Sequence, residues 1–397
     1  MHVGERIAAH RKRRGMSQEA LAGLVGMSRT WLSQVERGLR EVDRLSTLTD
    51  LASVLRVEVN ELIGKDWKLA PDVAPQVRAL DAIRSQLAGY AHLLGADADL
   101  WPLPQLRSAA VLVNREYQAA NYASASAMLP DVLGAADALD AFSGDDSREL
   151  HLARCMVYTV TAKLLTKVGE SQLAWLSADR AARAAMSADS TSAKAMAAYQ
   201  VVTALLKGQQ NDNAERLAVG TAESLMGRAT SDRPDIVSLA GAHWLIGSVI
   251  AGRRADRATA LQRLDQAEGL SGVLAQDANH AWTAFGPTNT LIHRASVNAE
   301  LGNHRGVLEA ATLIDPDALP GGLNGRRSRL HLNLAWAQSQ ARHDLEATMH
   351  LLQAERVAPE VVRFDGVARE LIRGLLKRSR RPAPALNKLA LRSGVLA

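Results

Sequence analysis

One segment of 22 residues, SQEALAGLVGMSRTWLSQVERG at positions 17–38, constrains the fold of this chain more than any other. Its apolar residues recur at helical spacing and fall on one face of each of two short helices. These residues are Leu21, Ala22 and Val25 in the first helix and Leu32 and Val35 in the second. The spacing therefore predicts two helices that are joined by a tight turn and packed through their apolar faces.

The ends of these two helices carry the residues that helix termini require. Ser17 and Ser28 stand at N-cap positions, where a hydroxyl accepts a hydrogen bond from a free backbone N–H. Gly26 stands in the turn, where the backbone needs a positive φ, and Ala22 is small enough for a close helix crossing. An ordinary helical hairpin with a solvated face is the alternative, but it does not explain why these features fall in register.

The remaining face of the second helix, at positions 28–37, is polar and suits the major groove of DNA. Arginine can bond O6 and N7 of guanine together, and glutamine can do the same for adenine, with about 1–3 kcal/mol of discrimination. We therefore expect Arg29, and then Gln34, to read bases. Arg40 and Arg44 follow in the next loop, where they either grip phosphates or are solvated loop charges.

The chain from about residue 4 to residue 63 resembles the lambda-repressor/Cro-like helix-turn-helix domain of the Xre regulators. The resemblance is carried by RKRRGMSQEALAGLVGMSRTWLSQVERG, a leucine-rich helix after it and the VEVNELIG ending. It implies a five-helix DNA-binding domain, an Arg11–Glu36 ion pair and a DNA contact from Gln18. Trp31 departs from the small or polar residue common in the family, so a DNA-backbone contact and a core position are both open for it. The candidate DNA-binding residues are Gln18, Ser28, Arg29, Thr30, Ser33, Gln34, Arg37, Arg40 and Arg44.

Length and composition fit a multidomain protein of the cytoplasm. A chain of 397 residues predicts two or three domains. The single cysteine, Cys155, excludes an intramolecular disulfide, and its apolar surroundings (CMVYTV) predict a buried thiol. No apolar stretch approaches the roughly 18 residues of a membrane span, and the basic N-terminus lacks the apolar region of a signal peptide. We therefore expect a cytoplasmic protein without a membrane partner.

Charge is distributed unevenly along the chain. The net charge of +5 divides into +3 for residues 1–65, −5 for residues 66–362 and +7 for residues 363–397. A basic N-terminal domain suits nucleic acid, whereas an acidic middle region does not. A basic C-terminal cluster either adds DNA affinity or, as we favour, complements the dipole of a last helix. The cluster consists of Arg373, Lys377, Arg378, Arg380 and Arg381.

A linker is predicted at residues 66–76, since Gly64, Pro71 and Pro75 interrupt any helix there. Residues 77–397 then show almost only helical periodicity, and one phrase recurs: a helix end, a turn, and a helix with an early small residue. Taking Ala174, Ala214, Ala258, Val307 and Ala347 as equivalent gives steps of 40, 44, 49 and 40 residues. The steps exceed the 34-residue tetratricopeptide period, so the region resembles degenerate tetratricopeptide repeats in a superhelix. An irregular helical bundle is the alternative, and the fold class is all-α in both cases.

The repeat region offers weaker signals for a ligand site. Asn289 and His293 share a helix face, asparagine can bond a peptide backbone, and Arg326 can hold a carboxylate. We take Asn289, His293, Arg326 and Asn333 as candidate ligand-binding residues, although helix caps and satisfied core polar groups are the more common explanation. The glycine-rich LPGGLNG loop at 319–325 is predicted to be a flexible connector.

The motifs of catalysis are missing from this sequence: it contains no HExxH, no GxxxxGK[ST] and no GxSxG. His331, His343 and His350 have no carboxylate at a spacing that suggests zinc. We therefore expect neither an enzyme nor a metal or cofactor, but a transcriptional regulator that binds double-stranded DNA as a homodimer. Its repeat region, which looks like that of actinobacterial Xre regulators, would dimerise or sense a peptide, small molecule or protein. The alternative is a protein-interaction adaptor whose helix-turn-helix only docks weakly on DNA.

Overall fold

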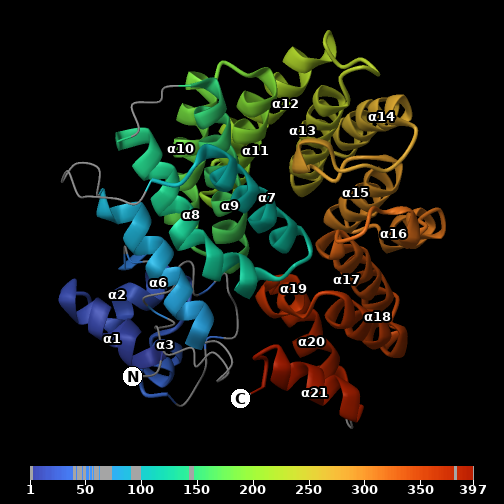
Figure 1. Ribbon diagram of the computed structural model, residues 1–397. Coiled ribbons are helices and arrows are strands. Elements are labelled where there is room, and N and C mark those ends of the chain that lie inside the picture. The colour runs from blue at the N-terminus through green and yellow to red at the C-terminus, as the bar shows by residue number, and fades with distance from the viewer. Residues whose placement is uncertain are drawn as a thin grey trace. The chain divides into compact units, whose positions relative to one another are not determined.

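The computed structural model describes residues 3–38, 42, 47, 51, 52, 54, 55, 57, 62, 74–90, 100–142, 147–379 and 382–396. Within these residues every regular element is a helix, which confirms the all-α class predicted from the sequence (Figure 1). The chain forms two compact units, Met1–Ala74 and Pro75–Ala397, which we call unit 1 and unit 2. Most of the predicted linker at 66–76 lies outside the described residues.

Unit 1 contains α1 (Val3–Arg13), α2 (Gln18–Leu24) and α3 (Arg29–Glu36). Further helical positions are described at 47, 51, 52, 54, 55 and 62, while the bounds of the other two predicted helices lie outside the described residues. A small apolar core joins these parts, and its largest fully buried side chains are Ile7, Leu21, Leu32, Leu51, Leu55 and Leu62. Burial of such side chains, at about 1.5–3 kcal/mol each, holds a domain of this size together.

The predicted helix ends of unit 1 are confirmed. The Ser17 hydroxyl accepts a hydrogen bond from the backbone N–H of Ala20 at 3.0 Å, and the Ser28 hydroxyl accepts one from Trp31 at 3.1 Å. Gly26 has a φ of +67°, as the turn between the helices requires. The Trp31 side chain packs in the core and is 9% exposed, so the core position is the one that it occupies.

Unit 2 is a succession of helices with short connections. Its elements are α6 (Ala74–Gly89), α7 (Leu103–Gln118), α8 (Tyr122–Phe142), α9 (Arg148–Val168), α10 (Ser171–Ser187), α11 (Thr191–Lys207), α12 (Asn211–Met226), α13 (Pro234–Arg253), α14 (Arg257–Leu274), α15 (Pro287–Glu300), α16 (His304–Thr312), α17 (Asn324–Gln340), α18 (Asp344–Val357), α19 (Pro359–Phe364), α20 (Gly366–Arg378) and α21 (Pro384–Arg392), with 3-10 helices η3 (His280–Trp282) and η4 (Pro316–Ala318). Cys155 on α9 is fully buried, as predicted.

Helices α7 to α18 pack pairwise as hairpins: α7 with α8, α9 with α10, α11 with α12, α13 with α14, α15 with α16 and α17 with α18 (Figure 1). The turn inside each of these hairpins places one residue in the left-handed region of φ. These residues are Ala120, Gly169, Gln209, Ala255, Gly302 and Arg342. The same backbone turn thus recurs in every hairpin, although only two of its six residues are glycines.

The second helix of the hairpins carries the repeated small residue, with one correction to the predicted register. Four of the five predicted positions are the fourth residue of their helix and are fully or almost fully buried: Ala174, Ala214, Val307 and Ala347. Ala258 is instead exposed, and Ala260, the fourth residue of α14, is buried in its place. The sequence offers alanines at both positions, and only packing against α13 selects one. With Ala260 the two middle steps become 46 and 47 residues.

The array of hairpins in unit 2 closes on itself. The backbone N–H of Ala123, at the start of α8, donates to Oε2 of Glu360 in α19 at 3.1 Å. Nδ2 of Asn324 in α17 donates to the carbonyl oxygen of Ala119 at 3.1 Å. One hydrophobic core accordingly combines residues of α6–α11 with residues of α17–α21, and Figure 1 shows α7 close to α19. The inner face of the array therefore surrounds an interior space.

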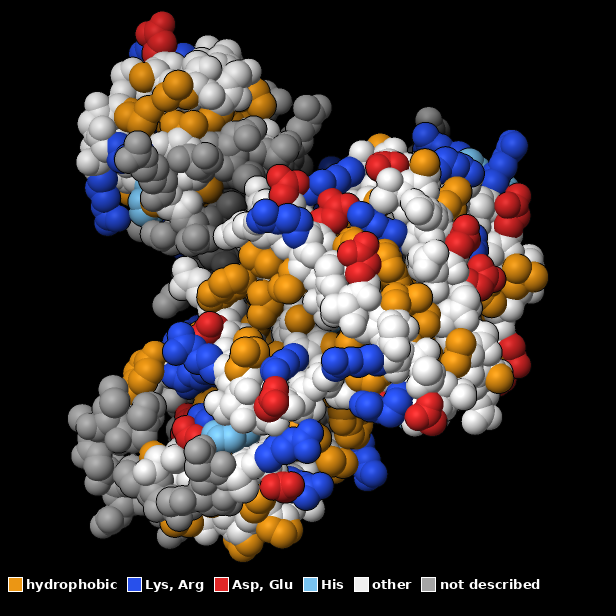
Figure 2. All heavy atoms as spheres, turned by 90° about the horizontal axis from the view of Figure 1, so that it is seen from above, with side chains coloured by type: hydrophobic (Ala, Val, Ile, Leu, Met, Phe, Trp, Pro, Cys, Tyr) orange, Lys and Arg blue, Asp and Glu red, His pale blue; other side chains and the backbone are white. Residues whose placement is uncertain are grey.

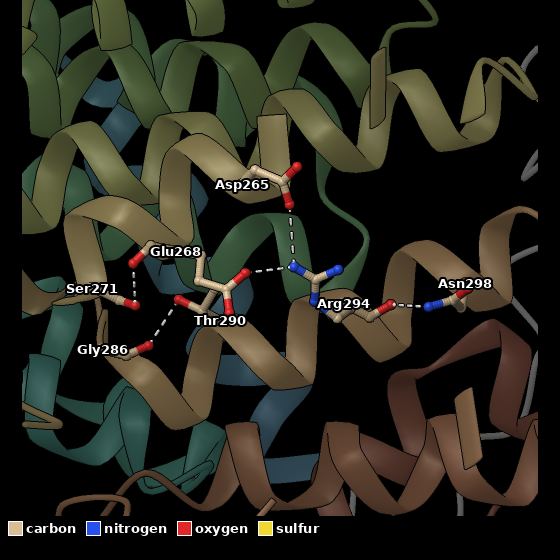
Figure 3. Close-up of polar contacts among 7 residues, drawn as sticks. All are labelled: Asp265, Glu268, Ser271, Gly286, Thr290, Arg294 and Asn298. Carbon is tan, nitrogen blue, oxygen red and sulfur yellow. Dashed lines mark hydrogen bonds and ion pairs between the residues drawn. The ribbon is translucent and has the colours of Figure 1, made fainter. Parts of the chain in front are cut away.

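Charged contacts connect neighbouring helices at the surface of unit 2. Nη2 of Arg294 on α15 lies 2.7 Å from Oε2 of Glu268 and 3.4 Å from Oδ1 of Asp265, both on α14 (Figure 3). Acidic and basic side chains are interspersed in this manner over the face shown in Figure 2. Exposed pairs contribute about 0–1 kcal/mol each, so the buried alanine and leucine stripes hold the hairpins together.

The prediction that no apolar stretch has the length of a membrane span is wrong for one helix, α13. By length and composition α13 qualifies, but 89% of its most apolar window is buried inside unit 2. Glycine, serine and histidine interrupt its apolar run, which is why the sequence did not reveal it. One of these glycines, Gly241, lies against the ring of Phe285, where an added Cβ would overlap the ring.

Candidate nucleic-acid interface and central cavity

Arg11 and Glu36 join α1 to the C-terminal end of α3. Nε of Arg11 lies 2.6 Å from Oε1 of Glu36, and Nη2 lies 2.9 Å from Oε2. A third guanidinium bond, 2.7 Å long, reaches the carbonyl oxygen of Met16 ahead of α2. The two side chains are only 10% and 6% exposed. The ion pair implied by the family resemblance is thus confirmed, and it fixes the position of α3 within unit 1.

Gln18, at the first position of α2, takes part in the same cluster. Its Nε2 donates to Oε2 of Glu36 at 2.7 Å. Burial raises the pKa of Glu36, but hydrogen bonds from Arg11 and Gln18 outweigh that effect and hold the pKa below its ordinary value of 4.5. One N–H of the Gln18 amide is therefore already bonded inside unit 1, which leaves its second N–H and its oxygen for the DNA contact implied by the resemblance.

The opposite face of α3 is open to solvent. Arg29, Thr30 and Arg37 are exposed, and Ser33 and Gln34 are half-buried. Within the described residues, the side chains of Arg29, Thr30 and Gln34 make no hydrogen bond, whereas Nε of Arg37 donates to the carbonyl oxygen of Ser33 at 3.2 Å. The structure therefore gathers the predicted reading residues on one accessible helix face. Arg40 and Arg44 lie outside the described residues.

Of the four residues predicted to hold a ligand, Arg326 lines a central cavity of unit 2, and the other three are not among the residues that line it. Asn333 on α17 donates to the hydroxyl of Ser296 on α15 at 2.8 Å. Nδ1 of His293 donates to the carbonyl oxygen of Asn289, one turn earlier, at 2.9 Å. Burial and the charge of Arg326 lower the pKa of His293 to about 3. Asn333 thus joins α15 to α17 and His293 is bonded within α15, whereas Oδ1 of Asn289 is buried without a hydrogen-bond partner in the described part of the chain.

The cavity has a volume of about 250 Å³ and lies where α7, α9, α11, α13 and α17 face one another. Four cationic side chains line it, two from α9 and two from α17: Lys163, Lys167, Arg326 and Arg329. Four aromatic side chains complete the wall: Tyr117, Tyr122, Tyr199 and Trp282. No lining residue in the described part of the chain is aspartate or glutamate. The two lysines were not among the predicted residues, although their spacing of four within the apolar helix TAKLLTKV was a usable signal.

The cations of the cavity have few internal partners. Burial and the charge of Arg326 lower the pKa of Lys163 to about 8, and burial with the charge of Arg329 lowers that of Lys167 to about 8. The Lys163 side chain is half-buried, whereas the Lys167 side chain keeps an exposed part that water in the cavity reaches. Nζ of Lys163 donates to the carbonyl oxygen of Trp282 at 3.3 Å. Among the described residues, Arg329 alone of these four cations has a close carboxylate, with Nη2 at 2.7 Å from Oδ2 of Asp365.

One wall of the cavity is the segment between α14 and α15. It places four non-glycine residues in the left-handed region of φ: Ala275, Ala281, Trp282 and Ala284. The side-chain amides of Asn279 and Gln118 form two hydrogen bonds, of 2.7 and 3.1 Å, that hold the segment against α7. Each left-handed residue costs about 1–2 kcal/mol, so this wall is a strained segment kept in place by its surroundings.

The structure also describes the loop at 319–325, before α17, and part of the basic C-terminal cluster, on α20. The LPGGLNG loop is not a flexible connector, because Leu319 and Leu323 are buried and Arg327 donates to the carbonyl oxygen of Leu319 at 2.7 Å. In the basic C-terminal cluster, Arg378 pairs with Asp344 at 2.6 Å and thereby ties α20 to α18. Arg380 and Arg381 lie outside the described residues. No group of three or more His, Cys, Asp or Glu in the described part is arranged to hold a metal ion.

Comparison with known proteins places the N-terminal part of the chain in a known class. Residues 2–62 match the protein family described as "Helix-turn-helix domain", and unit 1 therefore contains a helix-turn-helix domain. This is the class that the geometry of α2 and α3 defines.

Particular relatives are found among bacterial and phage proteins. The chain is 39% identical to the "Immunity repressor protein" of Bacillus phage phi105 over 74 residues. This alignment covers 19% of this chain and 51% of that protein. Over 63 residues it is 33% and 34% identical to the "HTH-type transcriptional regulator SinR" of Bacillus licheniformis and of Bacillus subtilis (strain 168), covering 16% of this chain and 57% of each relative. The chain thus spans about half the length of the curated relatives it matches. No solved structure matches it significantly.

Proposed function

We propose that the protein is a sequence-specific DNA-binding regulator of transcription, of the Xre type, in which unit 1 reads an operator. The observation that carries the proposal is the accessible polar face of α3 in a helix-turn-helix domain. The ion pair between Arg11 of α1 and Glu36 of α3 holds this helix in place. The names of the relatives, an immunity repressor and two transcriptional regulators, agree with it.

Within this proposal the residues of α3 divide into two roles. Arg29 reads guanine through its two guanidinium nitrogens, and Gln34 reads adenine, because these side chains match the paired acceptors and donors of those bases. Thr30 and Ser33 complete the base-reading face, and Gln18 contacts a phosphate or a base edge. The other candidate residues contact phosphates and set the register of the helix on DNA. These are Ser28, Arg37, Arg40 and Arg44.

Unit 2 serves as the dimerisation and sensing part of the proposed regulator, in the manner of a degenerate tetratricopeptide-like array of the actinobacterial type. The recurring left-handed turn and the buried small residue in each hairpin support this assignment. A homodimer follows from the short reach of one recognition helix, since two half-sites about one helical turn apart restore specificity. The proposed protein works in the cytoplasm, without a catalytic step and without a cofactor.

The test is selection from a random double-stranded DNA library by the full-length protein at physiological salt. We expect enrichment of an inverted repeat. Arg29→Ala should lose the preference for one base in each half-site, about a tenfold loss or more, and keep salt-sensitive non-specific binding. Arg37→Ala is the matched control, because loss of a phosphate contact weakens binding to all sequences alike.

Two outcomes would contradict the proposal at different levels. An Arg29→Ala protein that still selects the same repeat over scrambled DNA would remove Arg29 from the reading residues. A full-length protein that enriches no motif would overturn operator reading altogether and favour the adaptor alternative, in which the helix-turn-helix only docks on DNA.

A further inference from the structure

The central cavity of unit 2 concentrates positive charge inside a region of the chain that is otherwise acidic. Residues 66–362 carry a net charge of −5, yet Lys163, Lys167, Arg326 and Arg329 share one cavity of about 250 Å³. Asp365 forms a close ion pair with Arg329 and attracts the charge of Lys167 from a greater distance. The other three cations face the cavity without a close ion pair in the described part of the chain.

Such an arrangement destabilises the empty protein. Cations that lie deep in a protein lose hydration and repel one another, and the loss is recovered only when opposite charge is close. The protein supplies little negative charge close to the two lysines. Among the described residues, Lys163 bonds the carbonyl oxygen of Trp282, and Lys167 has no hydrogen-bond partner. A negatively charged molecule that enters the cavity would supply the missing compensation.

The remaining wall indicates what else that molecule carries. Tyr117, Tyr122, Tyr199 and Trp282 present aromatic surface beside the cations, and the rings of Tyr117 and Tyr122 lie 5.6 Å apart. Aromatic walls with a few charged groups are typical of small-molecule sites. A volume of about 250 Å³ lies below the usual range of roughly 300–1,000 Å³, so it suits a compact molecule.

The segment between α14 and α15 points to the same place. Its left-handed residues include Ala281, Trp282 and Ala284, and all three line the cavity. Strained backbone of this kind is concentrated at ligand sites. The Lys163–Trp282 hydrogen bond connects the strained wall directly to the cationic one.

We propose that the central cavity of unit 2 binds a compact organic anion, with its phosphate or carboxylate between the α9 lysines and Arg326 and its flat apolar part against the aromatic wall. Arg329, already paired with Asp365, supplies a further positive charge at the edge. That the anion also alters operator binding rests on the proposed function, whereas its binding to unit 2 does not.

The first experiment measures the melting temperature of the full-length protein, without DNA, in the presence of four probes. Phenyl phosphate and benzoate carry a ring and a charge, phenol carries the ring alone, and inorganic phosphate carries the charge alone. We expect phenyl phosphate or benzoate to raise Tm by about 3–6 °C at saturation, and the pair of anions separates a phosphate site from a carboxylate site. An equal effect of phenol, or no effect of either ring anion, would overturn the proposal.

Substitution of the lysines makes affinity and stability change in opposite directions. Lys163→Met and Lys167→Met should each weaken binding of the effective probe at least about tenfold, yet raise or preserve the Tm of the ligand-free protein. Lys377→Met, at an exposed position of α20, is the matched control and should leave the affinity unchanged. Equal affinity in the Lys163 and Lys377 variants would exclude the cationic wall from binding.

A measurement on the unmodified protein covers the case in which a variant misfolds. Acetylation by an N-hydroxysuccinimide ester, quantified by peptide mass spectrometry, reports the accessibility of Lys167 relative to Lys377. The effective probe should slow labelling of Lys167 at least about fivefold and leave Lys377 unaffected; equal labelling with and without probe would contradict the proposal. Operator selection repeated with the probe then tests the regulatory step separately, so that failure of either idea is recognised on its own.

Discussion

The guanidinium of Arg11 and the carboxylate of Glu36 form a bidentate ion pair, with nitrogen–oxygen distances of 2.6 and 2.9 Å, in a position that is almost closed to solvent. The pair joins the end of α1 to the end of α3. Arg11 also bonds the carbonyl oxygen of Met16, and Glu36 also accepts from Gln18. Because these bonds are directional, the cluster stabilises one particular arrangement of α1, α2 and α3.

Glu36→Gln should lower the free energy of unfolding of unit 1 by about 3 kcal/mol, since Arg11 would then keep a buried charge without a counter-ion. Hydrogen exchange of the full-length protein, followed on peptides from residues 3–38, measures the loss. Glu19→Gln, at an exposed position of α2, is the control and should change exchange little. The stabilisation by the pair is present above pH 4.5 and is lost as pH falls through the lowered pKa of Glu36. Equal hydrogen exchange in Glu36→Gln and the unmodified protein at neutral pH would contradict the prediction.

Gly241→Ala should lower the free energy of unfolding of unit 2 by about 2–3 kcal/mol, because the added methyl group overlaps the ring of Phe285. Gly247→Ala in the same helix meets side-chain atoms only at 3.5 Å and beyond. It should be neutral or stabilising by up to about 1 kcal/mol through helix propensity. Urea unfolding of the two variants measures the difference. Adding Phe285→Leu to Gly241→Ala should recover part of the loss, and strictly additive effects would argue against the overlap.

Ala255→Gly should raise the free energy of unfolding by about 0.5–1 kcal/mol. Ala255 has a φ of +59° in the turn between α13 and α14, where two equivalent turns already carry Gly169 and Gly302. Glycine removes the left-handed strain at the cost of some unfolded-state entropy. Ala258→Gly, three residues further on inside α14, removes the same methyl group from a helical residue and should be destabilising. Thermal unfolding of both variants decides the sign.

Unit 2 should become more stable as pH rises from 7.5 to 9.5. The pKa of Lys163 and of Lys167 is about 8 in the folded protein and about 10.5 when unfolded. Between these values the unfolded chain binds more protons, so rising pH favours the folded state. We expect a gain on the order of 1 kcal/mol, reduced by water in the cavity. Urea unfolding at both pH values measures it.

The neighbouring groups keep their charge state across this pH interval. Burial raises the pKa of Tyr117 and Tyr122 above its ordinary value, so both remain neutral, and the lowered pKa of Asp365 keeps it ionised. Lys207, Arg326 and Arg329 supply the other charges that face Lys167. Lys163→Met and Lys167→Met should therefore flatten the pH dependence, whereas Lys377→Met should not. An identical slope in all three would show that the lysines titrate normally.

The sequence by itself determined the local features of unit 1. Ser17, Ser28 and Gly26 were identified correctly because a cap or a turn depends on residues within about four positions. The Arg11–Glu36 pair, 25 positions apart, was accessible only through the resemblance to a family whose fold brings those positions together. Helical periodicity likewise sufficed for the all-α class, since the pattern of apolar residues is a property of each helix alone.

Only the tertiary structure decided what unit 2 surrounds. The closure between Ala123 and Glu360 spans 237 positions, and no local pattern encodes which of many alanine-rich helices will meet. For the same reason the sequence pointed to Asn289, His293 and Asn333 but gave no comparable signal for Lys163 and Lys167, which line the cavity. A buried lysine and a solvated one look alike in a sequence. They differ only in what the folded chain places around them, and burial is what turns an ordinary charge into one that needs a partner.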